Sequence, residues 1–217
     1  MKKIFFAAAI FCPALLTAQS FEGIMKFSWS YTGEQAAMLA QAMPSATTIY
    51  VKGTSTKVVS EGGMMSAMMG EVINIGSEKT TYFVMASEKS VYKVKSDEVK
   101  FKQDETATVT KESSTAIILG YKCQKYKVVT KNGTNYVWAT KEIDMSGVDY
   151  KGKIGYKGVE GMIMKHEMNV VDNGKTYVIT MTMTVFEKKS INDSEFKFPA
   201  DYTVKEEMPS IMKLQGN

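Results

Sequence analysis

The stretch MIMKHEMNVVDNGKTYVITMTMTVF, residues 162–186, decides the fold of this chain. Its centre is Asn173-Gly174, a pair that favours the two-residue turn of a β-hairpin. On both sides of the turn, apolar and polar side chains alternate, which is typical of a strand with one buried face. The stretch therefore predicts an antiparallel hairpin of two long strands, with Asp172 opposite Lys175.

Counting outward from this turn separates the hairpin into an apolar face and a mostly polar face. In this register His166 lies opposite Met181, and Met164 lies opposite Met183. A shift of one residue on either strand would mix the two faces, so the register is well specified. The apolar face collects Met162, Met164, His166, Met168, Val170, Tyr177, Ile179, Met181, Met183 and Val185.

Methionine is unusually frequent, with 17 residues against a single histidine. Because its side chain is unbranched and polarizable, methionine suits surfaces that adapt to varied apolar partners. Three interpretations stay open: an ordinary core, the wall of a cavity for a lipid or another hydrophobic ligand, and a soft-metal site. The candidate wall consists of Met162, Met164, Met168, Tyr177, Ile179, Met181 and Met183.

The soft-metal hypothesis rests on His166 and the thioethers that the register places beside it. Soft ligands select Cu(I) among the biological metals. The candidate ligand set is His166, Met164, Met181 and Met183. A conventional zinc site built from several histidines is excluded by the single histidine.

A second methionine cluster, flanked by Gly62-Gly63 and Gly70, interrupts the strands as a flexible insert. On a helix its members would stack in pairs four residues apart. We interpret the insert as a candidate lid over the same cavity or a second metal cluster, with docking of a loop on the sheet as the alternative. The cluster consists of Met64, Met65, Met68 and Met69.

The first eighteen residues have the plan of a secretory signal peptide. Lys2 and Lys3 precede an apolar run, and Ala18 supplies a small residue at the cleavage site. The run is too short for a membrane-spanning helix, which needs about 20 residues. We therefore expect a protein of the periplasm or secreted, cleaved after Ala18, with one β-rich domain over residues 19–217.

Two cysteines bear on anchoring and stability. Ile10 and Phe11 precede Cys12 where a lipoprotein signal needs small residues, so we do not expect a lipoprotein. Cys123 is then the one cysteine of the exported chain, either a buried free thiol or half of an intermolecular bridge. Without an internal disulfide, a hydrophobic core has to stabilise the fold.

Charge and motifs narrow the function classes. The formal net charge is +4, and losing Lys2 and Lys3 with the signal peptide leaves about +2. Lysines alternate with acids rather than clustering, which argues against a nucleic-acid partner. Export argues against enzymes that use ATP or NAD(P)H, and the glycines form no phosphate loop. We expect a non-enzymatic protein without a cofactor; a structural or stress-related envelope protein is a further alternative, favoured by an exposed apolar patch.

The rest of the chain predicts strands joined by short turns. Residues 21–31 alternate cleanly, and residues 32–35 fit a capping box for a short amphipathic helix that Pro44 would end. A second hairpin is predicted at Asn132-Gly133, with Lys131 opposite Thr134. Further strands are expected near residues 47–52, 54–60, 72–75, 81–86, 91–95 and 107–112, residues 113–119 are ambiguous, and residues 206–214 form a candidate terminal helix.

Several motifs, taken in order, resemble an uncharacterised family of exported proteins of Gram-negative bacteria, domain of unknown function 4412 (DUF4412). They are Phe21-Glu22-Gly23-Ile24, Tyr50-Val51-Lys52-Gly53, Gly63-Met64-Met65, Ile118-Leu119-Gly120-Tyr121-Lys122-Cys123, Tyr136-Val137-Trp138 and Phe196-Lys197-Phe198-Pro199-Ala200. In turn, that family resembles the lipoprotein-carrier (LolA-like) superfamily. The resemblance implies a curved antiparallel half-barrel of about 9–11 strands. One or two short helices would cover its concave face, where carriers of this type bind acyl chains.

Overall fold

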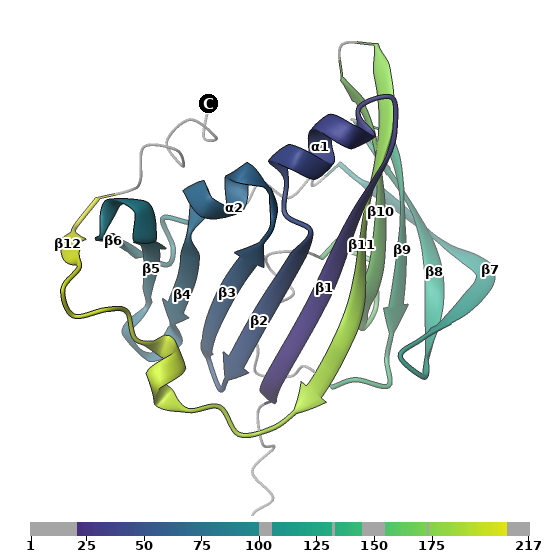
Figure 1. Ribbon diagram of the computed structural model, residues 1–217. Coiled ribbons are helices and arrows are strands. Elements are labelled where there is room, and N and C mark those ends of the chain that lie inside the picture. Colours follow the sequence, from purple (N-terminus) through teal and green to yellow (C-terminus); the bar gives the residue numbers. More distant parts are fainter. Residues whose placement is uncertain (1–20, 100–105, 132, 145–154, 173, 208–217) are drawn as a thin grey trace, which may run out of the picture.

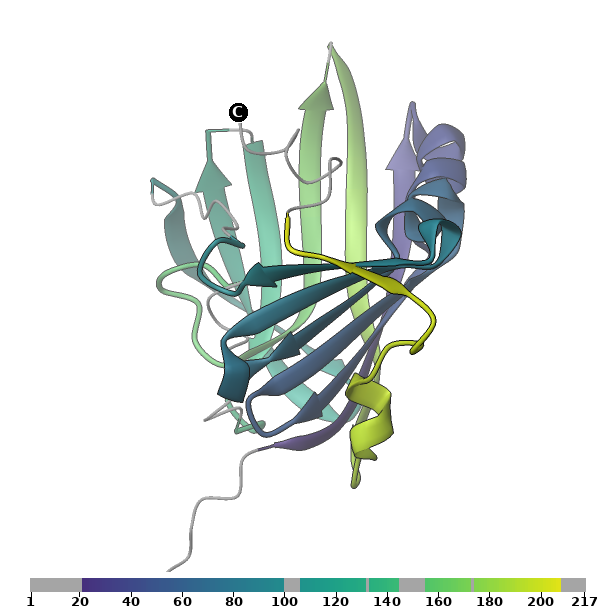
Figure 2. The same cartoon turned by 90° about the vertical axis from the view of Figure 1, so that its left-hand side faces the viewer.

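A single curved sheet dominates the computed structural model, which describes residues 21–99, 106–131, 133–144, 155–172 and 174–207 (Figures 1 and 2). Its twelve strands follow the order β12-β6-β5-β4-β3-β2-β1-β11-β10-β9-β8-β7. All neighbouring strands are antiparallel except β12 and β6, which are parallel. The predicted mainly-β class is confirmed, and the open sheet is mixed because of this one parallel pair.

The strands agree with the sequence pattern closely. They are β1 (Glu22–Gly33), β2 (Ala46–Lys52), β3 (Ser55–Glu61), β4 (Glu71–Ile75), β5 (Thr80–Met85), β6 (Ser90–Lys95), β7 (Thr108–Ile118), β8 (Tyr121–Thr130), β9 (Gly133–Thr140), β10 (Met162–Asp172), β11 (Lys175–Lys188) and β12 (Thr203–Lys205). The ambiguous residues 113–119 largely complete β7. The short strand β12 was not predicted, because three residues are too few for an alternating pattern.

The β10–β11 hairpin has the predicted register over most of its length. Asp172 pairs with Lys175 and His166 pairs with Met181. The ladder ends at Lys165 and Thr182, so the predicted pair of Met164 and Met183 is not part of it. The reason is a bulge: on the β9 side, the register shifts between Ile163 and Lys165, around Met164.

The β8–β9 hairpin differs from its predicted register by two residues. Its last pair is Thr130 with Gly133, and not Lys131 with Thr134. A shift of two keeps every side chain on its predicted face. The observed register places Lys125 opposite Trp138, where its ammonium group lies 5.3 Å from the indole centroid and 4.1 Å from the ring centroid of Tyr136.

Two short helices lie side by side at one end of the strands (Figure 1). Helix α1 (Ala36–Ala42) follows β1, as predicted, but its N-cap is Gln35 and no side chain caps it, so the expected capping box is wrong. Helix α2 (Gly63–Met69) replaces the predicted flexible insert. The helices contact each other and strands β1, β3 and β5, and neither contributes a residue to the main buried cluster of the described chain.

Three 3-10 turns complete the described structure: η1 (Gly76–Glu78), η2 (Ala86–Glu88) and η3 (Asp193–Phe196). After η3 the chain covers one face of β4–β6, where three aromatic side chains pack on buried aliphatic ones. These aromatic residues are Phe196, Phe198 and Tyr202. The predicted signal peptide and almost all of the predicted terminal helix lie outside the described residues. None of the helices in the described ranges is long and apolar enough to cross a membrane.

Gly70 joins α2 to β4 and offers a test of this connection. Its backbone φ is +63°, and a Cβ atom there would collide with the carbonyl oxygen of Val84. We expect Gly70→Ala to lower the free energy of unfolding by about 2 kcal/mol, because strain and collision add. The matched control is Gly120→Ala, whose φ is +83° but which has no described atom within 4 Å of the new Cβ. Urea unfolding should show a smaller loss of stability for Gly120→Ala, about 1 kcal/mol. Equal losses in the two variants would mean that α2 moves to relieve the collision at no cost in stability.

Candidate functional site

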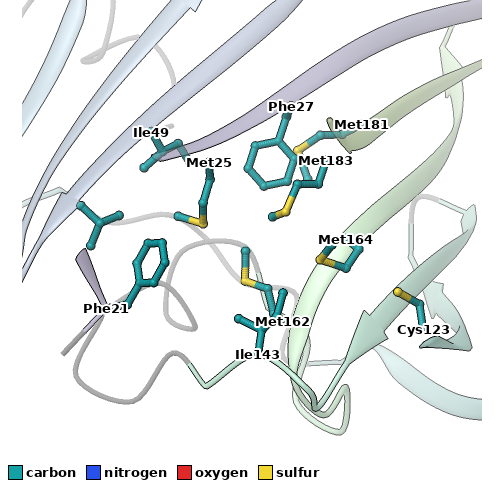
Figure 3. Packing of buried hydrophobic residues seen from close by; sticks show 11 residues of the cluster. Phe21, Met25, Phe27, Ile49, Cys123, Ile143, Met162, Met164, Met181 and Met183 are labelled. Carbon is teal, nitrogen blue, oxygen red and sulfur yellow. The ribbon is translucent and has the colours of Figure 1, made fainter. Parts of the chain in front are cut away.

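Four of the seven residues of the predicted methionine wall are buried. Met162, Met164, Met181 and Met183 are each between 0% and 4% exposed. They pack with Met25 of β1 in one cluster, together with aromatic and aliphatic side chains (Figure 3). We call these five residues the methionine cluster. The other buried residues packed with the methionine cluster are Phe21, Phe27, Ile49, Val51, Cys123 and Ile143.

Two irregularities in the sheet meet at the methionine cluster. One is the bulge in β10 around Met164. The other shifts the pairing of β1 with β11, where Lys26 faces Val185 but Phe27 faces Met183. Bulges redirect side chains and bend a strand. Met162, Ile163 and Met164 are buried in succession because β10 is covered on both sides here: Met162 and Met164 belong to the methionine cluster, and Ile163 belongs to a second buried cluster.

The other three residues of the wall are only half-buried. Met168, Tyr177 and Ile179 continue the same face of the hairpin toward its turn. The ladder places Tyr31 of β1 opposite Ile179 and Trp29 opposite Met181. Trp29, Tyr31, Met168, Tyr177 and Ile179 therefore form a continuous surface over three neighbouring strands, which we call the apolar strip.

Hydrogen bonds fix the aromatic members that β1 adds to the apolar strip. Trp29 Nε1 donates to Thr47 Oγ1 at 3.0 Å, and Tyr31 Oη donates to the carbonyl oxygen of Pro44 at 2.5 Å. Burial raises the pKa of Tyr31, so its hydroxyl stays protonated and donating. Because the polar atoms of both rings are satisfied by the protein, the strip presents mainly apolar surface.

His166 is part of a buried polar network. It is 6% exposed, and its Nε2 lies 3.2 Å from Tyr156 Oη. Asn135 Nδ2 donates to the same hydroxyl at 3.4 Å, and its Oδ1 accepts from the backbone N–H of Asn169 at 3.0 Å. Burial lowers the pKa of His166 to about 4, so the ring is neutral at neutral pH and can accept from Tyr156. The sequence indicated His166 but neither Tyr156 nor Asn135.

Tyr156 also belongs to a segment that covers part of the sheet. With Val159 it packs on a second buried cluster from β8, β9 and β10: Tyr126, Val128, Val137, Ala139 and Ile163. The rings of Tyr156 and His166 meet edge to face, with centroids 5.5 Å apart. A loop segment, rather than a helix, thus covers this surface.

The predicted lid residues lie away from the methionine cluster. Met64 and Met68 on α2 are 71% and 56% exposed, and Met65 is half-buried. The side chain of Met69 is outside the described residues. Ser66 is the buried residue of this helix, and its hydroxyl donates to the carbonyl oxygen of Gly62.

Cys123 is a buried free thiol, which was the first of the two roles predicted for it. Burial raises its pKa, which keeps the sulfur protonated and unreactive. Across the described ranges, no three side chains of the histidine, cysteine, aspartate and glutamate types gather where they could hold a metal ion. Any metal bound at the wall would therefore depend on thioethers.

The family model for DUF4412, a domain of unknown function, matches residues 21–202. The chain belongs to this family. The match covers the whole described sheet except its last strand, and it agrees with the family that the sequence motifs resemble. No curated protein matches the chain.

Among solved structures, the chain is similar to PNGF-II in two crystal forms. The identities are 14% and 15%, with TM-scores of 0.45 and 0.46. Each comparison covers 88% of this chain, but only 32% and 33% of the PNGF-II chain. The chain thus spans about a third of the length of these structures.

Proposed function

We propose that this DUF4412 protein is an exported, non-enzymatic protein that binds a lipid acyl chain or a similar hydrophobic molecule along the apolar strip. The observation that carries the proposal is the change in burial along one face. Met164 and Met183 are closed into the core, whereas Met168, Tyr177 and Ile179 on the same hairpin are partly open. Adaptable apolar side chains are therefore partly exposed next to a packed cluster on the same strands.

The chemistry of the strip supports a hydrophobic ligand. Its members carry no charge, and its β1 aromatic rings have their polar atoms bonded to the protein. Burying a chain contributes about 0.8 kcal/mol per CH₂ group, against which the cost of association counts. An acyl chain of ordinary length would therefore bind without any polar contact. The proposal includes the LolA-like relationship that the sequence motifs suggest, because carriers of that type bind acyl chains.

Ile179→Lys is the sharpest test of the apolar strip. We expect the change to weaken binding of a fluorescent fatty acid at least about tenfold, because it removes roughly 1.5–3 kcal/mol of apolar burial and adds a charge. The fold should persist, since lysine can extend its ammonium group from a half-buried position into water. Fluorescence titration of the mature protein gives the affinity, and circular dichroism checks the fold.

The matched control is Val178→Lys, because Val178 is the next residue, is also half-buried and faces the opposite side of β11. It should bind the probe like the unchanged protein. Equal affinity of both variants would place the ligand elsewhere, and no binding by the unchanged protein would refute the proposal. Native mass spectrometry of gently purified protein, with lipid extraction, would then identify any ligand that it carries.

A second candidate function is a structural role through a partner, and the helices favour it. Neither α1 nor α2 contains a charged residue, and their exposed faces carry Met38, Met64 and Met68 at 56–71% exposure. An exposed apolar patch is typical of an interaction surface. If Met64→Gln with Met68→Gln abolishes function in the cell while fatty-acid binding is unchanged, this role is the correct one.

A further inference from the structure

We propose that the methionine cluster is a binding site for a soft monovalent metal ion, Cu(I), formed by thioether sulfurs alone. This goes beyond the proposed hydrophobic ligand, because it concerns the closed part of the wall rather than the apolar strip. It also differs from the set that the sequence indicated: Met25 and Met162 enter the candidate site, and His166 leaves it.

The arrangement of the sulfurs supports the site. Met25 comes from β1, Met162 and Met164 from β10, and Met181 and Met183 from β11. Figure 3 shows Met25, Met162, Met164 and Met183 below the ring of Phe27, around one shared space, with Met181 beside that ring. The five thioethers thus come from three neighbouring strands and belong to one buried cluster. Because methionine has three rotatable bonds, the sulfurs can regroup around an ion without movement of the backbone.

The local irregularity of the sheet supports the same centre. The bulge at Met164 lies on β10, and the register shift beside Met183 lies between β1 and β11, so both irregularities occur next to methionines of the cluster. An ordinary apolar core needs no bulge, since regular alternation already buries one face. Bulges are frequent next to functional sites, where they re-aim individual side chains.

The chemistry of the donors determines which ion fits. Thioethers are soft ligands that select Cu(I), whereas Mg²⁺ and Ca²⁺ take oxygen ligands. Among the described residues, no three histidine, cysteine, aspartate or glutamate side chains lie close enough together to hold a divalent ion. His166 Nε2 lies 3.2 Å from the hydroxyl of Tyr156, which occupies this nitrogen.

The test measures Cu(I) affinity of the mature protein by competition with a colorimetric Cu(I) chelator. The key variant is Met164→Leu with Met183→Leu, because leucine keeps volume and apolarity, and such exchanges are well tolerated. The matched control is Met64→Leu with Met68→Leu, two exposed methionines on α2. Losing even a partner of a metal ligand costs about 10–100-fold in affinity, so we expect at least that loss in the key variant and no change in the control.

Three results of the competition assay would overturn the site: no Cu(I) uptake by the unchanged protein, equal affinity of the key variant, or loss of affinity in the control. X-ray absorption of the Cu(I)-loaded unchanged protein gives a readout that does not depend on any variant folding. A coordination shell of sulfur alone supports the site, whereas nitrogen in that shell would return His166 as a ligand and refute it. Because leucine preserves the apolar surface, fatty-acid binding should stay unchanged in the key variant, so the two proposals fail separately.

Discussion

Phe27→Ala is expected to lower the free energy of unfolding by about 3–5 kcal/mol, the range for removing a large aromatic ring from a packed core. Phe27 is 1% exposed and lies among the side chains of Met25, Met181 and Met183 (Figure 3). Deleting the ring removes its own burial and leaves a cavity that several strands would have to move to fill. A loss of this size is a large share of the 5–15 kcal/mol that stabilises a typical domain.

Urea unfolding of the two proteins measures this loss, and Met183→Leu is the matched control. That exchange keeps the volume of the same cluster and should cost less than about 1.5 kcal/mol. The comparison also decides between a filled core and an open cavity at the closed end of the wall. A cost below about 1 kcal/mol for Phe27→Ala would show that the surroundings of the ring are already open.

The hairpin of β10 and β11 shows how far alternation alone can predict structure. From Lys165 to Asp172 the pairing follows the pattern residue by residue, because one face is apolar and a slip would expose it. The prediction ends at Met164, where the ladder bulges. Met162, Ile163 and Met164 are all apolar, so the sequence carries no signal of which one leaves the regular alternation.

The same limit applies to the division of the wall into closed and half-open parts. Met164 and Met168 are the same residue type on the same strand, yet the first is 0% exposed and the second is half-buried. What differs is the side chains brought from other strands and loops, such as Phe27 and Ile143, which lie far away in the sequence. Long-range packing of this kind leaves no trace in local periodicity.

Turn and helix signals in the sequence predicted which elements form better than they predicted register or rigidity. Asn132-Gly133 correctly predicted a hairpin, but the pairing shifts by two residues, which brings the buried Tyr126 opposite the buried Val137. The glycines around residues 63–69 suggested flexibility. Instead, they bound a regular helix, because glycine at positive φ can also end a helix.

Lowering the pH from 7 to 4 is expected to remove about 3 kcal/mol of stability through His166. The folded protein lowers the pKa of this histidine to about 4 by burial, whereas the unfolded chain has the ordinary value of 6.5. Below pH 6.5 the unfolded chain therefore binds a proton that the folded protein does not, and unfolding is favoured. With 1.36 kcal/mol per pKa unit, the loss is about 2 kcal/mol at pH 5 and about 3 kcal/mol at pH 4.

This pH window separates His166 from the acidic residues. The pKa values of Glu160 and Asp193 are lowered from 4.5 and 3.8 by hydrogen bonds from lysines, so their protonation destabilises the fold mainly at more acidic pH. Since His166 is the single histidine of the chain, His166→Gln should flatten the stability curve between pH 6.5 and 4, whatever its effect at pH 7. Urea unfolding at pH 7, 6, 5 and 4 measures both curves. A slope that persists in the variant would assign the effect to other groups.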